Sequence, residues 1–331
     1  MLIDEFLEPK ILIVSGKGGV GKTTVAGALA LVAARHDRKV CVAEVDRKGS
    51  LPKLFGAGEV AYEPRELSPG VWGINIVPEH ALAEYLKVQY RMNRIAKVFR
   101  TTQFVDMITT AAPGLKDILV LGKIWYLEQN RQTGDGRHDF DTIIVDAPAA
   151  GHMLSFLEAP RGLSDAVRVG PVRRQAEWLN QMLCDSKRTR VHLVTLAEEM
   201  PVAETLETSQ ALDERLSIAQ GSLFANALYS ELLDDKELAL LDEMAEDGSI
   251  DELRAEGKEA GLRLDDEDLA AMHGYANFLR ARRSIQVGYL KELRKGTSCP
   301  VVELPFLFSA GLALPDIESL ADVIEANVES M

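Results

Sequence analysis

The run Lys10-Ile11-Leu12-Ile13-Val14-Ser15, followed by Gly16-Lys17-Gly18-Gly19-Val20-Gly21-Lys22-Thr23, decides the fold of this chain. It begins as a short apolar, β-branched segment, passes through a glycine-rich loop and continues into residues 24–34, which have helical composition. The loop matches G-x-x-x-x-G-K-[ST] in full, between a predicted strand and a predicted helix, as that pattern requires. The sequence therefore predicts a nucleoside-triphosphate site.

The residue types in this loop suit phosphate binding. Glycines let backbone N–H groups turn inward around phosphate oxygens, and the following helix N-terminus adds partial positive charge. We expect Lys22 to reach the β- and γ-phosphates, and Thr23 to place its hydroxyl on Mg²⁺. The residues expected to bind ATP with Mg²⁺ are Gly16, Lys17, Gly18, Gly19, Val20, Gly21, Lys22, Thr23 and Thr24.

The rest of the chain alternates strands with helices. Apolar strand candidates are 38–46, 72–77, 142–145, 191–196, 222–226 and 301–304. Such alternation predicts an α/β fold with a doubly wound, mostly parallel sheet. Residues 79–129 and 231–293 look helical throughout, apart from a break near Pro113. We expect a single P-loop domain over 1–331, with these two regions forming a helical subdomain.

Two carboxylates end predicted strands and are candidates for the chemistry. Ligands in open α/β sheets lie beyond the carboxyl ends of strands, which places Asp46 and Asp146 near the phosphates. Asp46 is the candidate catalytic residue that orients or deprotonates the attacking water, with Glu44 as a weaker candidate. Its structural alternative is a helix N-cap or turn. Asp146 is expected to hold Mg²⁺ through a water ligand.

The segment Gly16–Thr24, read as GKGGVGKTT, resembles the deviant P-loop (deviant Walker A motif) of the ATPase class that includes the MinD/ParA proteins and the arsenite-pump and tail-anchored-protein-targeting ATPases. In that class the extra lysine reaches the nucleotide of the other subunit. The resemblance thus implies that Lys17 is catalytic across an ATP-sandwiched dimer, stabilising phosphoryl charge as an arginine finger does. By itself, Lys17 could equally be an exposed loop lysine.

The segment Asp146–Pro160, DAPAAGHMLSFLEAP, is similar to switch II of the arsenite-pump/targeting (ArsA-like) family. There the segment couples the γ-phosphate state to helical movement, and Gly151 would supply a flexible joint. His152 has a structural reading as a hydrogen-bonded histidine. Asp46 stands at the switch I aspartate, but this chain continues Arg47-Lys48-Gly49 where the family typically has Pro-Ala-His.

Three later segments extend the resemblance over nearly the whole chain. Residues 195–205 look like a stretch common in bacterial members, Asn226 stands at the adenine-reading asparagine, and Pro305 stands at the base of the purine-floor loop. The resemblance is closest to ArsA-like ATPases of actinobacteria and related bacteria. It implies a homodimer, or a heterodimer with a paralogous ATPase.

Composition and cysteine positions exclude other functions. The net charge of −14 disfavours broad nucleic-acid binding, which needs a basic face. Cys41, Cys184 and Cys299 are far apart in sequence and no CxxC occurs, so we expect neither zinc nor metalloid binding. The acidic N-terminal segment lacks a signal pattern, and no apolar run is long enough for a membrane span. We expect a cytoplasmic protein, with peripheral membrane binding left open.

Three functions remain in competition. The first is a dimeric ATP-driven switch whose protein or membrane client binds 79–129 together with 170–183. Leu82, Tyr85, Leu86, Tyr90 and Met92 could line its groove, although such residues more often belong to a core. The second is a MinD/ParA-like positioning ATPase on membrane or nucleoid, which the acidic C-terminal end disfavours. The third is a small-molecule phosphotransferase, for which no substrate motif is visible.

Overall fold

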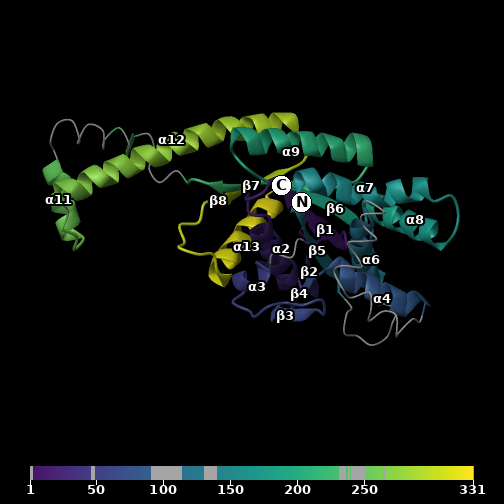
Figure 1. Ribbon diagram of the computed structural model, residues 1–331. Coiled ribbons are helices and arrows are strands. Elements are labelled where there is room, and N and C mark those ends of the chain that lie inside the picture. The colour runs from purple at the N-terminus through teal and green to yellow at the C-terminus, as the bar shows by residue number, and fades with distance from the viewer. Residues whose placement is uncertain are drawn as a thin grey trace.

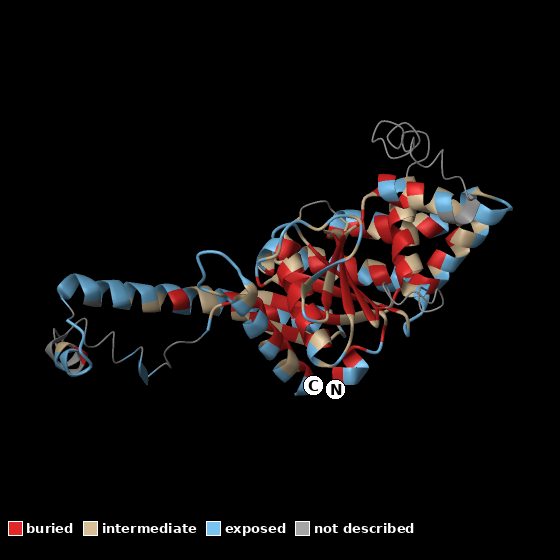
Figure 2. Cartoon of the chain, turned by 90° about the horizontal axis from the view of Figure 1, so that it is seen from below, coloured by how far each residue is buried: buried red, intermediate tan, exposed pale blue. Residues whose placement is uncertain are grey.

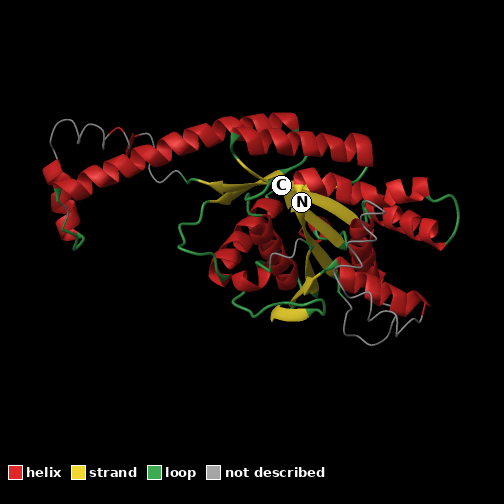
Figure 3. Ribbon diagram, viewed as in Figure 1, coloured by secondary structure: helices red, strands yellow, loops and turns green. Residues whose placement is uncertain are grey.

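The computed structural model describes residues 3–45, 49–90, 114–129, 140–230, 250–263 and 265–330, together with 236, 237 and 239. In this part of the chain eight strands form one sheet, in the order β3-β4-β2-β5-β1-β6-β7-β8 (Figures 1 and 3). The strands are β1 (Ile11–Gly16), β2 (Val40–Glu44), β3 (Arg65–Ser68), β4 (Val71–Asn75), β5 (Thr142–Ala149), β6 (Thr189–Leu196), β7 (Gln220–Leu228) and β8 (Val301–Pro305). The expected α/β fold with a mostly parallel sheet is confirmed.

One strand, β3, was absent from the sequence prediction. It pairs antiparallel with β4, whereas every other neighbouring pair in the sheet is parallel. Its four residues, Arg-Glu-Leu-Ser, are exposed or half-buried, because β3 lies at the edge of the sheet. A strand that short and polar carries no apolar pattern by which sequence analysis could find it.

Helices cover both faces of the sheet because side chains alternate along each strand. In β1, Leu12 and Val14 pack in one buried cluster, and Ile11 and Ile13 pack in another. The first cluster includes residues of α1 (Ile3–Phe6), α2 (Lys22–Arg35), α3 (Leu51–Leu54) and α13 (Leu314–Glu329). The second includes residues of α6 (Leu115–Gln129), α7 (Ala150–Ala166), α8 (Pro171–Cys184), α9 (Glu199–Ala211), the π-helical turn Leu212–Leu216 and α12 (Asp266–Gly296).

The described parts of the two regions expected to be helical lie in different places. Helix α4 (Pro78–Tyr90) packs with α6 beside the sheet, whereas α11 (Ile250–Glu259) and the first half of α12 project away from the body (Figures 1 and 2). Asp265 caps α12 by accepting hydrogen bonds from the backbone N–H groups of Glu267 and Asp268. No helix in the described part of the chain is both long and apolar enough to cross a membrane.

Candidate nucleotide site

The glycine-rich loop leaves the carboxyl end of β1, between its neighbours β5 and β6. Two of its glycines are required by close contacts. A Cβ at Gly16 would lie 2.0 Å from the carbonyl oxygen of Val194, and one at Gly21 would lie 2.3 Å from Asn226 Nδ2. Gly21 also has φ +94°, a left-handed conformation that L side chains rarely adopt. The loop therefore packs tightly against β6 and β7 before α2 begins at Lys22.

A polar cavity of about 280 Å³ opens beside the loop. Lys22 is buried and its Nζ donates to the carbonyl oxygen of Lys17 at 3.1 Å. Thr23 Oγ1 donates to Asp146 Oδ2 at 2.6 Å. The cavity is lined by Gly19, Gly21, Lys22, Thr23, Thr24, Glu44, Asp146 and Ala147. The fold thus brings together the loop and the end of β5, more than a hundred residues later in the sequence.

These groups are chemically suited to a nucleotide with a hard divalent cation. A hydroxyl and a carboxylate in direct contact supply the oxygen ligands that Mg²⁺ prefers. The nearby ammonium of Lys22 suits phosphate, and the helix N-terminus following Gly21 favours negative charge. Asp146 is buried, and its carboxylate accepts the Thr23 hydroxyl beside the cavity.

Glu44 also lines the cavity, but it is tied to the local backbone. Its Oε1 accepts the N–H groups of Ser50 at 3.0 Å and Leu51 at 3.1 Å. Burial raises the pKa of Glu44, and these two hydrogen bonds lower it in part. Glu44 therefore holds the segment that follows residues 46–48. Asp46, the predicted catalytic residue, lies outside the described residues, as do Arg47 and Lys48.

Lys17 has a partner that sequence analysis missed. Its Nζ lies 3.5 Å from Glu204 Oε2 in α9, and each of these two side chains is 33% exposed. Glu204 lies in the segment 195–205 that carried part of the family resemblance, but no spacing linked it to the loop. The pair is half open to solvent, so Lys17 can leave it at little energetic cost.

Asn226 lies near the end of β7, and Pro305 ends the neighbouring strand β8. Asn226 Nδ2 donates to the carbonyl oxygen of Val20 at 2.8 Å, so its amide supports the loop in this structure. Pro305 is the last residue of β8. It leads into an aromatic cluster in which Phe306 stacks on Tyr229 at 5.0 Å between ring centroids and meets Phe308 at 4.8 Å. The aromatic residues that follow Pro305 are visible in the sequence, but the sequence analysis did not use them to predict this cluster.

The segment resembling switch II forms the start of α7. Gly151 and His152 are exposed and lie in its first turn, so the glycine expected to act as a joint is helical here. Asp117 of α6 lies close enough to His152 for the charges of the two side chains to interact. Burial raises the pKa of Asp117, and the charge of His152 lowers it in part. The start of α7 therefore faces α6, the helix that separates it from α4.

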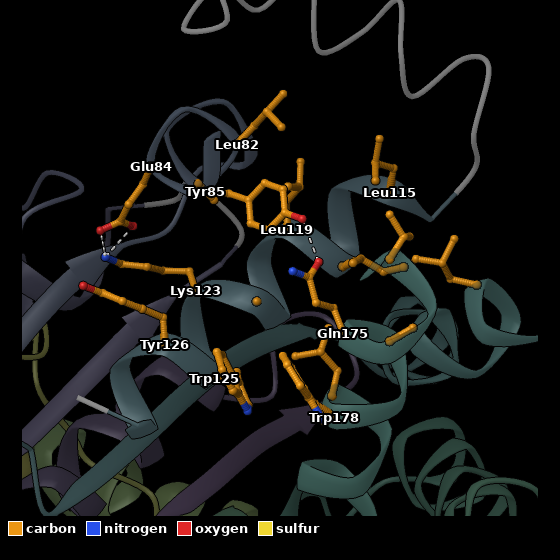
Figure 4. A pocket seen from close by; sticks show the side chains of 17 residues that line it. Leu82, Glu84, Tyr85, Leu115, Leu119, Lys123, Trp125, Tyr126, Gln175 and Trp178 are labelled. Atoms are coloured by element: carbon orange, nitrogen blue, oxygen red, sulfur yellow. Dashed lines mark hydrogen bonds and ion pairs between the residues drawn. The ribbon is translucent and has the colours of Figure 1, made fainter. Parts of the chain in front are cut away.

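A second cavity, of about 250 Å³, lies among α4, α6, α7 and α8 (Figure 4). Leu82 and Tyr85, two of the five residues suggested as a groove, line it. Leu86 does not line it, the side chain of Tyr90 is not described, and Met92 lies outside the described residues. Part of α8, within the predicted segment 170–183, forms the opposite wall.

The cysteines occupy three separate elements. Cys41 is buried in β2, Cys184 is the exposed last residue of α8, and Cys299 is half-buried before β8. Burial raises the pKa of the Cys41 thiol to about 12. Over the described residues, no group of three or more His, Cys, Asp or Glu side chains is placed to hold a metal ion.

Known proteins are similar to this chain. Residues 9–175 match the protein family described as anion-transporting ATPase. The chain belongs to this family. "ATPase BagA" of Mycobacterium tuberculosis is 35% identical over 274 residues, which cover 80% of this chain and 77% of that protein. Family membership and this relative make the chain an ATPase, as its loop predicted.

More distant relatives carry names from arsenic transport. The "Arsenical pump-driving ATPase" of Acidiphilium multivorum is 25% identical over 223 residues, covering 62% of this chain and 37% of that protein. A "Putative arsenical pump-driving ATPase" of Prosthecochloris vibrioformis is 24% identical over 265 residues, covering 69% of this chain and 62% of that protein. The predicted ArsA-like resemblance, with its actinobacterial character, is therefore confirmed.

Proposed function

We propose that this ATPase is a Mg-ATP-dependent dimeric switch, in which the nucleotide state controls the binding of a client among α4, α6 and α8. The observation that carries the proposal is the hydrogen bond of 2.6 Å between Thr23 and Asp146 inside the polar cavity. It joins the loop to the strand that continues directly into α7, which packs against both α6 and α8.

In this proposal each described residue of the site has one role. Lys22 binds the β- and γ-phosphates, Thr23 holds Mg²⁺ directly, and Asp146 holds it through a water molecule. When bound, Mg²⁺ neutralises part of the phosphate charge. Asn226 supports the loop and Pro305 borders the purine. The half-exposed pair with Glu204 leaves Lys17 able to reach the nucleotide of a second subunit, which is this chain or a paralogue.

The catalytic water is assigned to Asp46, and the role of Glu44 follows from its contacts. A carboxylate that already accepts two backbone N–H groups is poorly placed to move and accept a proton. Glu44 therefore holds the start of α3, which follows residues 46–48. The separate locations of the three cysteines support a client other than a metalloid.

Sedimentation equilibrium of the Asp46→Asn variant tests the proposal. We expect Mg-ATP to double the measured mass, while ATP turnover falls by roughly 10²–10⁴-fold because the base is lost. Lys22→Ala is the matched control, which should stay at the mass of one chain in Mg-ATP. An unchanged mass of the Asp46→Asn variant with and without Mg-ATP would count against the dimer. Normal turnover would show that Asp46 is not the catalytic residue.

A further inference from the structure

The cavity among the helices is apolar along most of its wall, with an ion pair at one side (Figure 4). Trp125 of α6 and Trp178 of α8 stack in parallel, with ring centroids 5.7 Å apart and an interplanar angle of 10°. In the ion pair, Lys123 Nζ binds both carboxylate oxygens of Glu84, at 2.8 and 2.9 Å. Because these two charges neutralise each other, the interior suits an uncharged ligand group.

Gly122 shows that the cavity is kept open. It lies inside α6 and lines the cavity, and a Cβ built on it would meet no atom of the described residues within 4 Å. Glycine is less favourable than alanine within a helix, and contacts among the described residues do not require it here. A larger side chain at this position would enter the cavity, so the glycine preserves room for an occupant.

The volume limits what that occupant is. A helix 10–12 Å across occupies on the order of 140 Å³ per residue, so a cavity of about 250 Å³ holds less than two residues of it. An engineered apolar cavity of about 150 Å³ binds benzene, and pockets for drug-sized ligands start near 300 Å³. The cavity volume therefore suits one alkyl chain better than a whole helix.

The stretch of chain that forms one wall of the cavity is positively charged on an otherwise acidic protein. Val172 and Trp178 line the cavity and are 42% and 45% exposed, so this wall borders solvent. The stretch 168–178, which includes this wall, contains Arg168, Arg173, Arg174 and a single acidic residue, Glu177, whereas the whole chain has net charge −14. Arg173 is paired with Glu177 at 2.8 Å, and Arg168 and Arg174 are exposed. The charge of this stretch complements an anionic group.

We propose that this cavity binds the alkyl chain of a single-chain anionic amphiphile of the fatty-acid type, with its head group at the arginines of 168–174. The proposal names the chemical class of client and rests on the proposed function only in treating the cavity as the client site. Apolar burial along Trp125, Leu119 and Tyr85 supplies affinity, and the arginines select the charge of the head.

Tryptophan fluorescence of the whole ATP-free protein, titrated with dodecanoate below its micellar concentration, tests this. Two of the three tryptophans line the cavity, and Trp72 lies in β4, so a saturable change in emission is expected. Gly122→Leu should weaken dodecanoate binding at least tenfold. Gly122→Ala, which adds only a Cβ, should change it less than threefold. Equal affinity of wild type and Gly122→Leu would overturn the proposal.

The double variant Arg168→Gln/Arg174→Gln tests whether the arginines bind the head group. This variant should bind dodecanoate three- to tenfold more weakly and bind dodecanol as wild type does; equal loss for both ligands would overturn the charge assignment.

In a separate experiment, vesicles of phosphatidylglycerol should leave the protein in the supernatant, and co-sedimentation would point instead to a membrane surface. Lys22→Ala should retain dodecanoate binding while losing ATP turnover, which separates this proposal from the ATP switch.

Discussion

Each of the two cavities has a lysine–glutamate pair at its edge, and the two pairs differ in how firmly they are held. At the nucleotide site, Lys17 and Glu204 lie 3.5 Å apart and each side chain is 33% exposed. At the apolar cavity, Lys123 and Glu84 lie 2.8 Å apart, with Lys123 only 6% exposed. Water weakens the first pair, whereas burial makes the second costly to break. The same type of ion pair therefore leaves Lys17 able to move and holds Lys123 in place.

The neighbours of Lys123 strengthen this difference. Its Nζ lies 4.7 Å from the ring centroid of Tyr62 and 5.3 Å from that of Tyr126. The Tyr62 hydroxyl donates to Glu84 Oε2 at 2.5 Å, and burial together with the Glu84 charge raises the pKa of Tyr62. These aromatic and polar contacts hold Lys123 in place, whereas Lys17 has one weakly held ion-pair partner among the residues that the structure describes.

The largest expected effect comes from removing the loosely held lysine. Lys17→Ala should lower ATP turnover by roughly 10³-fold or more, as loss of an arginine finger does. Its free energy of unfolding should change by no more than about 0.5 kcal/mol, because the lost ion pair is solvated. Phosphate release and urea denaturation measure the two quantities. A variant that keeps wild-type turnover would show that Lys17 is an ordinary surface lysine.

Removing the buried lysine, Lys123, should instead lower the stability of the fold. Lys123→Met should lower the free energy of unfolding by about 2–3 kcal/mol, because Glu84 is left without its cation; Glu84 is 29% exposed, which moderates the cost. The double variant Lys123→Met/Glu84→Gln should recover part of that loss. Urea denaturation of the single and double variants gives the comparison. A loss below about 0.5 kcal/mol would mean that the pair is as weak as the exposed one.

Alanine substitutions at two glycines of the loop should lower the free energy of unfolding by amounts in the same range as that for Lys123→Met. Alanine at Gly19, with φ +86°, or at Gly21, with φ +94°, should cost about 1–2 kcal/mol of strain. Gly21→Ala should cost about 1 kcal/mol more, because the new Cβ displaces Asn226 and breaks its bond to Val20. Thermal unfolding of both variants measures the difference. Equal losses would show that Asn226 adjusts without leaving the loop.

The smallest expected effect is the coupling within the exposed pair. A double-mutant cycle with Lys17→Ala and Glu204→Gln should give a coupling of no more than about 0.5 kcal/mol. The same cycle on Lys123 and Glu84 should give a clearly larger value. Glu204→Gln alone should keep turnover within threefold of wild type, since it retains Lys17. Comparable coupling in both cycles would remove the distinction between the two pairs.

The candidate nucleotide site was largely predictable from the sequence because its residues are concentrated in contiguous segments. The loop, β1 and the strand that carries Asp146 have apolar runs and glycines that local patterns identify. The rule that ligands lie at the carboxyl ends of strands predicted Asp146 near the loop, and the structure places it in contact with Thr23. Glu204 was missed because its contact with Lys17 depends on where α9 lies, which no local pattern encodes.

The apolar cavity was readable only in part. Leu82 and Tyr85 were expected on a groove, yet the same pattern also describes a core helix, and Leu86 proved not to line the cavity. Its distinguishing features are the open space above Gly122 and the stacking of Trp125 on Trp178. Both depend on how α6 and α8 are packed, so periodicity in one helix cannot show them.

The projecting first half of helix α12 has a hydrodynamic consequence. The whole helix of 31 residues spans about 46 Å at 1.5 Å per residue, and about half of that length projects from the body. A compact chain of 331 residues would have a radius of gyration of about 20 Å. Friction on the arm will therefore slow diffusion and make a single chain elute early from a sizing column. Oligomeric state in this protein has to be judged from mass, as equilibrium sedimentation or light scattering gives it, rather than from Stokes radius.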